Sequence, residues 1–338
     1  MNLVIRRISQ SFLLFAFVVL SVSSVFAQAV PDNAPISDQK AGSVLIYNYY
    51  GSSAINYNSE DTKVSITNTN LQSAAMVSLF FIDAVSGDVT KSYICLLANQ
   101  TASFRMVDVD PGAKGYIVAV SVDATGRPNK FNYLTGSELI KMSSGHVAGM
   151  NAEAISALVD SPTIGLNPNG IESGIAATLR FDGVRYNKLP GALVLDYIPP
   201  IVEGNKTMII VNQIGGSLLF NGKPDDLTSL TGTVYDAVTN AHFWQVGNIN
   251  TCQFRKVIAN DFPQTAPNMS TVVEPGRSAW MKFHPHGANK GVTGVVLYLQ
   301  SVTQNTLPND SRFTGGRNLH HMTLTTDELT IPIIAPSC

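Results

Sequence analysis

The chain has 338 residues, of which 22 are basic, 24 are acidic and three are cysteine. A formal charge of −2 without a basic stripe argues against a nucleic-acid-binding protein, which needs positive charge gathered on one face. Three cysteines are too few for a disulfide-dense miniprotein, so apolar packing must hold the fold together. The length is enough for two domains of ordinary size.

Residues 1–27 have the pattern of a secretory signal peptide. Arg6 and Arg7 form the charged start, an apolar run follows, and the stretch ends with the small residue Ala27 before Gln28. We expect cleavage after Ala27; a retained transmembrane anchor is the alternative. Without the two leader arginines, 20 basic residues face 24 acidic ones.

Export without a membrane span is the resulting expectation for the mature chain. No later stretch approaches the roughly 18 consecutive apolar residues that span a bilayer. We therefore expect no transmembrane segment after leader cleavage. The compact leader and sparse cysteines favour a bacterial protein of the periplasm or cell surface, or one that is released.

From residue 41 onward, the chain reads as a succession of short strands. Stretches 43–50, 63–68 and 116–123 are rich in β-branched and aromatic residues, and turn-forming residues separate them. Many short strands at this spacing favour β-sandwiches over a βαβ fold. Residues 147–159 contain helix formers near helical spacing, so we expect a single short helix there.

Five sequence blocks recur in the same order in the two halves of the chain. The pairs are 42–47 with 191–196, 66–68 with 210–212, 81–87 with 234–240, 102–106 with 278–282, and 115–118 with 294–297. Internal duplication is the interpretation we favour; chance similarity among strand sequences is the alternative.

The duplication defines the predicted domain organisation. We predict an all-β chain of two tandem immunoglobulin-like antiparallel β-sandwiches, with a linker at 28–40 and domains at 41–188 and 189–338. No Cys-Trp-Cys arrangement is present, so the immunoglobulin analogy concerns fold and not function.

Three tyrosines near the start of the mature chain are candidates for ligand binding. Tyr47 and Tyr49 share one face of a predicted strand, and Tyr50 adjoins them, a geometry that suits stacking on a sugar ring. Packing into the sandwich core is the alternative. Trp244 and Trp280 are expected to be core anchors.

Four histidines form the best metal candidate. His284 and His286 would share a strand face, and His320 and His321 follow further on. No acidic or cysteine ligand lies beside either pair in sequence, so surface histidines at turns are the alternative.

The cysteines allow one disulfide. An oxidising exterior favours pairing Cys252 with Cys338, since both belong to the second predicted domain. Cys95 would then be a buried free thiol. A bond between Cys95 and Cys252 is the competing possibility, because sequence cannot settle connectivity.

No catalytic motif accompanies this architecture: the chain lacks a Gly-x-Ser-x-Gly elbow, and its carboxylate pairs lie at predicted turns. We predict a non-enzymatic cell-envelope, appendage or matrix protein without a cofactor. Its partners would be other envelope or extracellular proteins, or copies of itself, with strand addition at sheet edges as one route. The alternatives are a carbohydrate-binding module and a histidine-based metal-binding protein.

Overall fold

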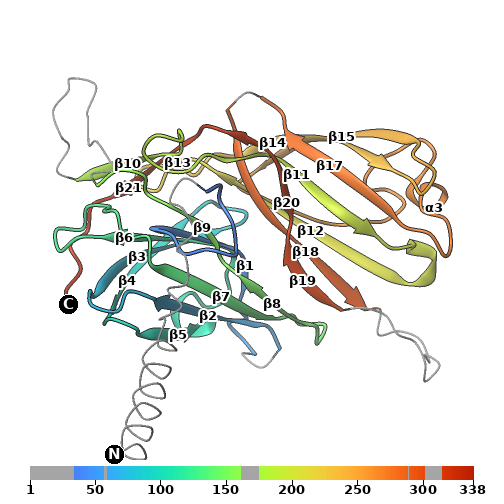
Figure 1. Cartoon of the computed structure of the whole chain (residues 1–338). Coiled ribbons are helices and arrows are strands. Elements are labelled where there is room, and N and C mark those ends of the chain that lie inside the picture. Colours follow the sequence, from blue (N-terminus) through green and yellow to red (C-terminus); the bar gives the residue numbers. More distant parts are fainter. Residues whose placement is uncertain (1–33, 57–58, 161–174, 288, 301–313) are drawn as a thin grey trace, which may run out of the picture. The chain divides into compact units, whose positions relative to one another are not determined.

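The computed structural model describes residues 34–56, 59–160, 175–287, 289–300 and 314–338 (Figure 1). This part of the chain is all-β and consists of several sheets, in which all strand pairs but one are antiparallel. Its α-helices have four residues each, so none is long enough to cross a membrane. The predicted leader lies outside the described residues.

Two sheets in the first half of the chain face each other across one core. We call them the first sheet pair. A five-stranded sheet has the order β4-β3-β6-β1-β9, and a four-stranded sheet has the order β5-β2-β7-β8. Leu45, Val64, Phe81 and Ile117 are buried between them. The strands are β1 (Val44–Gly51), β2 (Asp61–Asn68), β3 (Ala75–Asp83), β4 (Val89–Leu96), β5 (Thr101–Arg105), β6 (Lys114–Val122), β7 (Leu134–Lys141), β8 (Val147–Asn151) and β9 (Glu153–Ile155).

The second half of the chain contains the second sheet pair. Its five-stranded sheet has the order β15-β14-β17-β11-β20, and its four-stranded sheet has the order β16-β12-β18-β19. Trp244 and Phe283 are buried in the core between them. The strands are β11 (Leu189–Ile198), β12 (Asn205–Ile214), β14 (Leu227–Tyr235), β15 (Ala241–Thr251), β16 (Gln253–Val257), β17 (Ala279–Pro285), β18 (Gly291–Gln300), β19 (Gly315–Asn318) and β20 (His320–Thr325).

The two sheet pairs have the same strand order. β1 to β9 correspond in sequence to β11, β12 and β14 to β20, and each occupies the corresponding place in its sheet. The short helices also correspond, since α2 (Met106–Val109) follows β5 and α3 (Met269–Val272) follows β16. In each helix, the methionine at the first position is buried.

Three of the five aligned sequence blocks fall on corresponding strands, but two of these three, 42–47 with 191–196 and 66–68 with 210–212, are one residue out of register with the structure. The other two alignments are wrong by one strand: 102–106 lies at β5 but was matched to β17, and 115–118 lies in β6 but was matched to β18. Short strand sequences resemble one another too closely to fix such an alignment. The immunoglobulin-like form is not confirmed, because β1 and β2 lie in different sheets, whereas the first two immunoglobulin strands share one.

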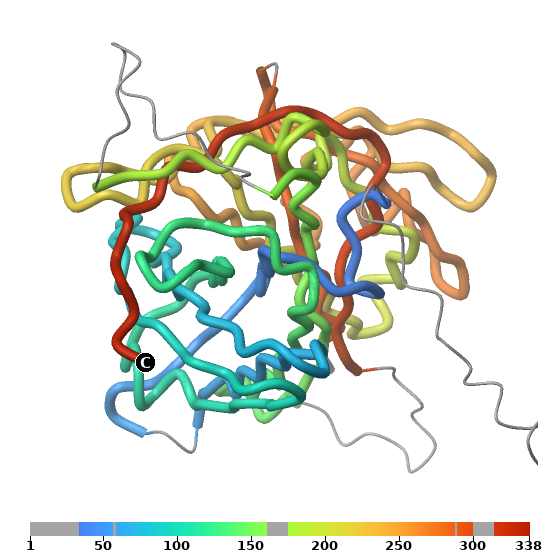
Figure 2. The backbone as a smooth tube through the Cα atoms, turned by 60° about the vertical axis from the view of Figure 1, so that its left-hand side comes forward, coloured from blue at the N-terminus to red at the C-terminus, as the bar shows by residue number. Residues whose placement is uncertain are grey.

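A third sheet covers the outer face of the first five-stranded sheet. It has the order β10-β21-β13, formed by β10 (Ala176–Arg180), β21 (Glu328–Pro332) and β13 (Gly216–Ser217). Leu179 and Ile331 share a buried core with Val44 and Phe80. The last strand therefore packs on the first sheet pair, and the chain end continues along it (Figure 2). A 3₁₀ turn, η1 (Ile201–Glu203), precedes β12.

The helix predicted at 147–159 is wrong. Residues 147–151 form β8 and 153–155 form β9; in β8, Val147, Gly149 and Asn151 are exposed while Ala148 and Met150 are buried. The same small and apolar residues fit a period of two as well as one of 3.6, and pairing with β7 decides between them.

The described part of the predicted linker is packed against the first half of the chain. Ser37 forms a bridge with Ala154, and the buried Lys40 donates from Nζ to Asn187 Oδ1 at 2.7 Å and to Ser156 Oγ at 3.0 Å. The domain boundaries themselves stay a prediction.

Candidate interaction site at the junction of the sheet pairs

The first sheet pair contacts the outer face of the second four-stranded sheet. A bulge in β1 lies between Tyr47 and Tyr50, where the register with β6 shifts. Beside this bulge, a separate apolar core joins the pairs; we call this contact the internal joint. Its buried members are Tyr49, Ile140, Ala148 and Met150 from the first pair and Ile210, Val295 and Leu297 from the second.

Polar groups complete the internal joint. Asn212 donates from Nδ2 to Asn48 O at 2.9 Å and to Asn48 Oδ1 at 3.1 Å, and Gln253 donates to Asn212 Oδ1 at 2.7 Å. Arg255 donates to the Tyr49 hydroxyl at 3.3 Å. Since the three amide side chains are buried, their hydrogen bonds favour one relative position of the two pairs.

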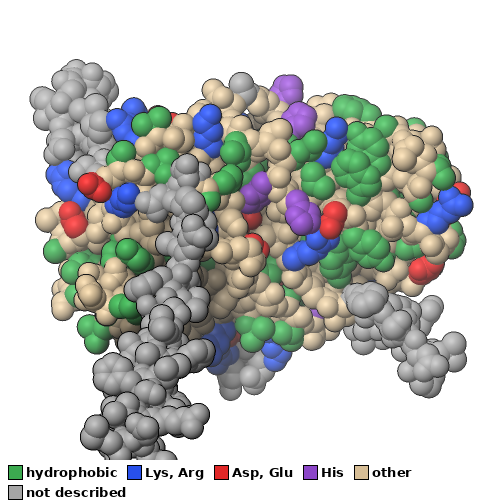
Figure 3. All heavy atoms as spheres, in the orientation of Figure 1, with side chains coloured by type: hydrophobic (Ala, Val, Ile, Leu, Met, Phe, Trp, Pro, Cys, Tyr) green, Lys and Arg blue, Asp and Glu red, His purple; other side chains and the backbone are tan. Residues whose placement is uncertain are grey.

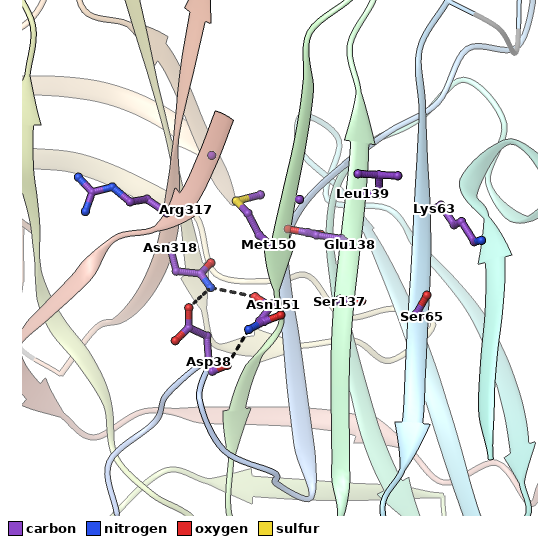
Figure 4. Close-up of a pocket in the computed structure, with 12 residues that line it drawn as sticks. Asp38, Lys63, Ser65, Ser137, Glu138, Leu139, Met150, Asn151, Arg317 and Asn318 are labelled. Atoms are coloured by element: carbon purple, nitrogen blue, oxygen red, sulfur yellow. Dashed lines mark hydrogen bonds between the residues drawn. The ribbon is translucent and has the colours of Figure 1, made fainter. Parts of the chain in front are cut away.

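A polar cleft of about 520 Å³ opens beside the internal joint (Figure 4). Its floor is the outer face of β2, β7 and β8, where Lys63, Ser65, Ser137 and Leu139 lie. Its wall is β19, together with Asp38. Asn318 donates to Asp38 Oδ2 at 3.0 Å and to Asn151 O at 2.8 Å, so these three residues converge, whereas Arg317 points away from them.

The floor of the cleft belongs to a hydroxyl-rich surface. Cross-strand register aligns serines in one row and threonines in the next. We call this surface the hydroxyl face; it consists of Ser65, Thr67, Thr101, Ser103, Thr135 and Ser137. Ser65 and Ser103 hydroxyls are 2.8 Å apart, and those of Thr67 and Thr101 are 2.7 Å apart. This face presents hydrogen-bonding groups on a regular sheet.

Two carboxyl groups are buried behind the cleft. Neither oxygen of Glu138 has a side-chain hydrogen-bond partner among the described residues, but the backbone N–H of Tyr49 lies near them. Burial raises the pKa of Glu138 well above its ordinary value; the backbone N–H of Tyr49 opposes this rise, and the nearby Glu153 adds to it, so the site favours the neutral carboxyl. Glu153 Oε1 lies 3.0 Å from His321 Nε2. Burial opposes charge on His321, but hydrogen bonding and attraction from Glu153 outweigh it and raise the pKa of the imidazole.

A second cavity, of about 450 Å³, lies at the free end of the second sheet pair. We call this region the open end; it consists of Asp196, Tyr197, Lys206, Tyr298 and Arg317. The rings of Tyr197 and Tyr298 are 6.0 Å apart, and the Tyr298 hydroxyl donates to Tyr197 O at 3.0 Å. Arg317 donates to both oxygens of Asp196 and to the Tyr298 hydroxyl. These hydrogen bonds are the leading cause that lowers the pKa of Asp196.

The three tyrosines predicted to bind a sugar are fully buried, so this prediction is wrong. Tyr47 donates its hydroxyl to Ser65 O, Tyr50 donates to Asp110 Oδ2, and Tyr49 belongs to the internal joint. β1 is covered on both faces, and no ring of it reaches solvent.

The four candidate histidines do not form a metal site in the described part of the chain, where no suitable group of three or more ligands occurs. His284 and His286 are exposed, and His284 lies within 3.0 Å of Pro285 O. His320 contacts Asp196 at 3.3 Å, while His321 contacts Glu153. Figure 3 shows histidines at several separate places on one face.

The predicted disulfide between Cys252 and Cys338 is also wrong. Cys338 is bonded to Cys95, with Cα atoms 6.1 Å apart, whereas Cys252 is a buried free thiol. Its thiol donates to Asp83 O at 3.2 Å, and burial raises its pKa to about 12. The disulfide follows from the path of β21, which brings the chain end to β4.

Sequence reasoning missed the exposed aromatic residues. Trp244 is buried as expected, but Trp280 is 37% exposed and stacks on Tyr235 with ring centres 4.3 Å apart. Tyr197 is 41% exposed beside a second bulge, between Leu195 and Ile198. In the sequence, the only signal of this exposed ring was the break at Asp196-Tyr197 in the alternation of polar and apolar residues.

No family model and no curated protein matches the chain. Solved structures resemble it only weakly. A protein of Thermotoga maritima, 1070, is 11% identical, with a TM-score of 0.26, over 33% of this chain and 92% of that one. A Streptomyces avermitilis α-L-rhamnosidase is 7% identical, with a TM-score of 0.19, over 89% and 26%. The major pilin of Streptococcus pyogenes is 9% identical, with a TM-score of 0.21, over 86% and 97%. These values are too low to assign a function.

Proposed function

We propose that this protein is an exported, non-enzymatic component of the cell envelope, an appendage or the extracellular matrix, and that it acts through protein–protein contacts. The observation that carries the proposal is the internal joint, in which one sheet pair buries an apolar and amide-rich surface of the other. Such a joint holds the outer surfaces in fixed positions, which suits a protein that presents surfaces to partners.

Two further features support this reading. A disulfide between Cys95 and Cys338 is typical of proteins in oxidising compartments, in agreement with the predicted leader. The matching strand orders support an origin of the two sheet pairs as tandem β-sandwiches by internal duplication. A carbohydrate-binding protein is the second candidate, favoured by the half-exposed Tyr197 ring in the open end.

Expression of the full chain in a bacterium, followed by fractionation, tests the proposal. We expect mature protein beginning at Gln28 outside the cytoplasm, associated with itself or with envelope proteins in light scattering and cross-linking. Ala27→Phe, which removes the small residue at the cut, should retain the leader. Protein that keeps Met1 in the cytoplasm with reduced Cys95 and Cys338 would contradict export.

A further inference from the structure

We propose that copies of this chain associate head to tail, with the open end of one molecule docking on the hydroxyl face of the next. The contact would repeat between molecules the internal joint that exists within each chain. This inference rests on the proposed function, since it identifies a second copy of the chain as one of the partners.

The open end corresponds to the surface that the first sheet pair uses in the internal joint. The bulge of β1 lies between Tyr47 and Tyr50, and that of β11 lies between Leu195 and Ile198. Asp196 and Tyr197 therefore take the positions of Asn48 and Tyr49. In the first sheet pair these residues are buried against the second, whereas the Asp196 side chain is 46% exposed.

The neighbouring strands show the same correspondence. Ile66 pairs with Gly136 in the first pair, and Val211 pairs with Gly294 in the second, which aligns β7 with β18. Tyr298 then takes the place of Ile140. Through the registers of β8 and β19, Arg317 takes the place of Met150. Among the described residues, the open end is thus an uncovered counterpart of a buried docking surface.

The hydroxyl face corresponds to the other side of the internal joint. Register places Ser65 opposite Ser103 and Thr67 opposite Thr101. The corresponding pairs are Ile210 with Arg255 and Asn212 with Gln253, which receive the first sheet pair. Thr101, Ser103 and Ser137 are exposed, so the face is accessible in the single molecule.

The chemistry of the two exposed surfaces is complementary. In the internal joint, Asn48 accepts hydrogen bonds from Asn212, which itself accepts one from Gln253. At the corresponding intermolecular position, the Asp196 carboxylate would accept from the hydroxyls of Thr67 and Thr101. The contacts of Asp196 with Arg317 and His320 leave lone pairs on the Asp196 carboxylate oxygens that can accept these additional hydrogen bonds.

The intermolecular contact should be weaker than the internal joint and open-ended. Ser65 and Ser137 stand where the internal joint has Ile210 and Val295, so less apolar surface is buried. Because two different surfaces meet, the contact is heterologous and can continue from molecule to molecule. Association should therefore be reversible and increase with concentration.

Sedimentation velocity of the mature chain across a range of concentrations tests this contact. Tyr197→Arg should block the open end, and Thr101→Glu should place a carboxylate against Asp196; each should weaken association at least about tenfold. A mixture of the two variants should form a dimer and nothing larger, since one intact surface of each kind remains. Thr101→Lys should strengthen association by pairing with Asp196.

Val238→Arg, at an exposed turn away from both surfaces, is the matched control and should associate as the unchanged protein does. Assembly that is unaffected by both blocking variants would overturn this contact but leave the proposed function standing. A protein that stays monomeric at all concentrations, but is recovered from the cell exterior together with another protein, would also overturn this contact and leave the proposed function standing. A monomer that binds soluble oligosaccharides through Tyr197 would assign the open end to carbohydrate instead and overturn the inference.

Discussion

At the scale of single residues, Glu138 is the most unusual group in the described chain. It sits on β7 at a position whose neighbours in alternation, Gly136 and Ile140, also point inward. A carboxyl at such a position loses its hydration, and no described side chain replaces it with a hydrogen bond. Burial therefore favours the protonated form of this carboxyl.

Glu138→Gln should therefore stabilise the protein, and increasingly so at higher pH. The folded-state pKa of Glu138 lies above the unfolded value of about 4.3, so the folded state holds a proton that the unfolded state has lost. That difference lowers the stability of the unchanged protein as pH rises above about 4, whereas glutamine does not titrate. We expect little difference at pH 4 and a gain in stability that grows as the pH rises to 7 and above.

Urea denaturation between pH 4 and pH 8 measures this effect. The exposed Glu274, changed to Gln in the same way, is the control and should show no comparable trend. A loss of stability that is equal at every pH would mean that the Glu138 carboxyl is ionised and hydrogen-bonded in the folded protein.

At the scale of elements, close approach between β1 and β7 depends on a glycine. A Cβ at Gly136 would overlap the hydroxyl of Tyr47, which is fully buried and donates to Ser65 O at 2.9 Å. The two sheets of the first pair are in contact here, and a rigid ring has nowhere to move. The close approach of β1 to β7 thus requires one small residue, Gly136, opposite one large one, Tyr47.

Gly136→Ala should destabilise the protein by about 1–3 kcal/mol, the usual effect of overpacking. Tyr47→Phe removes the nearest of the atoms that the new methyl meets but leaves the ring carbons, so the double variant should recover part of this loss. A double-mutant cycle in urea measures the coupling. Gly149→Ala, in β8 of the same sheet, has ordinary contacts and should have little effect; equal losses at both glycines would argue against the specific overlap.

At the scale of the whole molecule, the C-terminal segment joins distant parts of the chain. β21 pairs with β10, and Cys338 is bonded to Cys95, 243 residues earlier. A crosslink of this span restricts the unfolded chain strongly in the loop-entropy account. The chain end therefore contributes to the stability of the first sheet pair.

Cys338→Ser should lower the free energy of unfolding by about 2–5 kcal/mol. The unchanged protein under reducing conditions should show the same loss of stability as the variant. The stability of the variant itself should not change when reductant is added. Thiol titration of the denatured, unreduced protein should find one thiol, that of Cys252. Three free thiols would contradict the disulfide.

How much of the fold and of the candidate site could be predicted from the sequence depends on how far apart along the chain the interacting residues lie. Alternating β-branched residues and turn residues act locally, which is why the all-β class and the strands at 43–50, 63–68 and 116–123 followed from the sequence. The segment 147–159 fitted two periods equally, and only the neighbouring β7 decided for strands. The candidate site could not be predicted from the sequence, because packing between distant segments brings Asp38, Asn151 and Asn318 together.

The sequence by itself determined the β-rich class, the turns and the repetition of strand patterns, since these depend on neighbours along the chain. Tertiary structure decided which faces are covered. Tyr49 is buried and Tyr197 is exposed at corresponding bulges, because among the described residues a second surface docks against this end of the first sheet pair and none docks against that of the second. It also decided that Cys338 meets Cys95, because the last strand crosses back to the first half of the chain. Alternation along a strand defines two faces, but what lies against each is set by segments far away in the sequence.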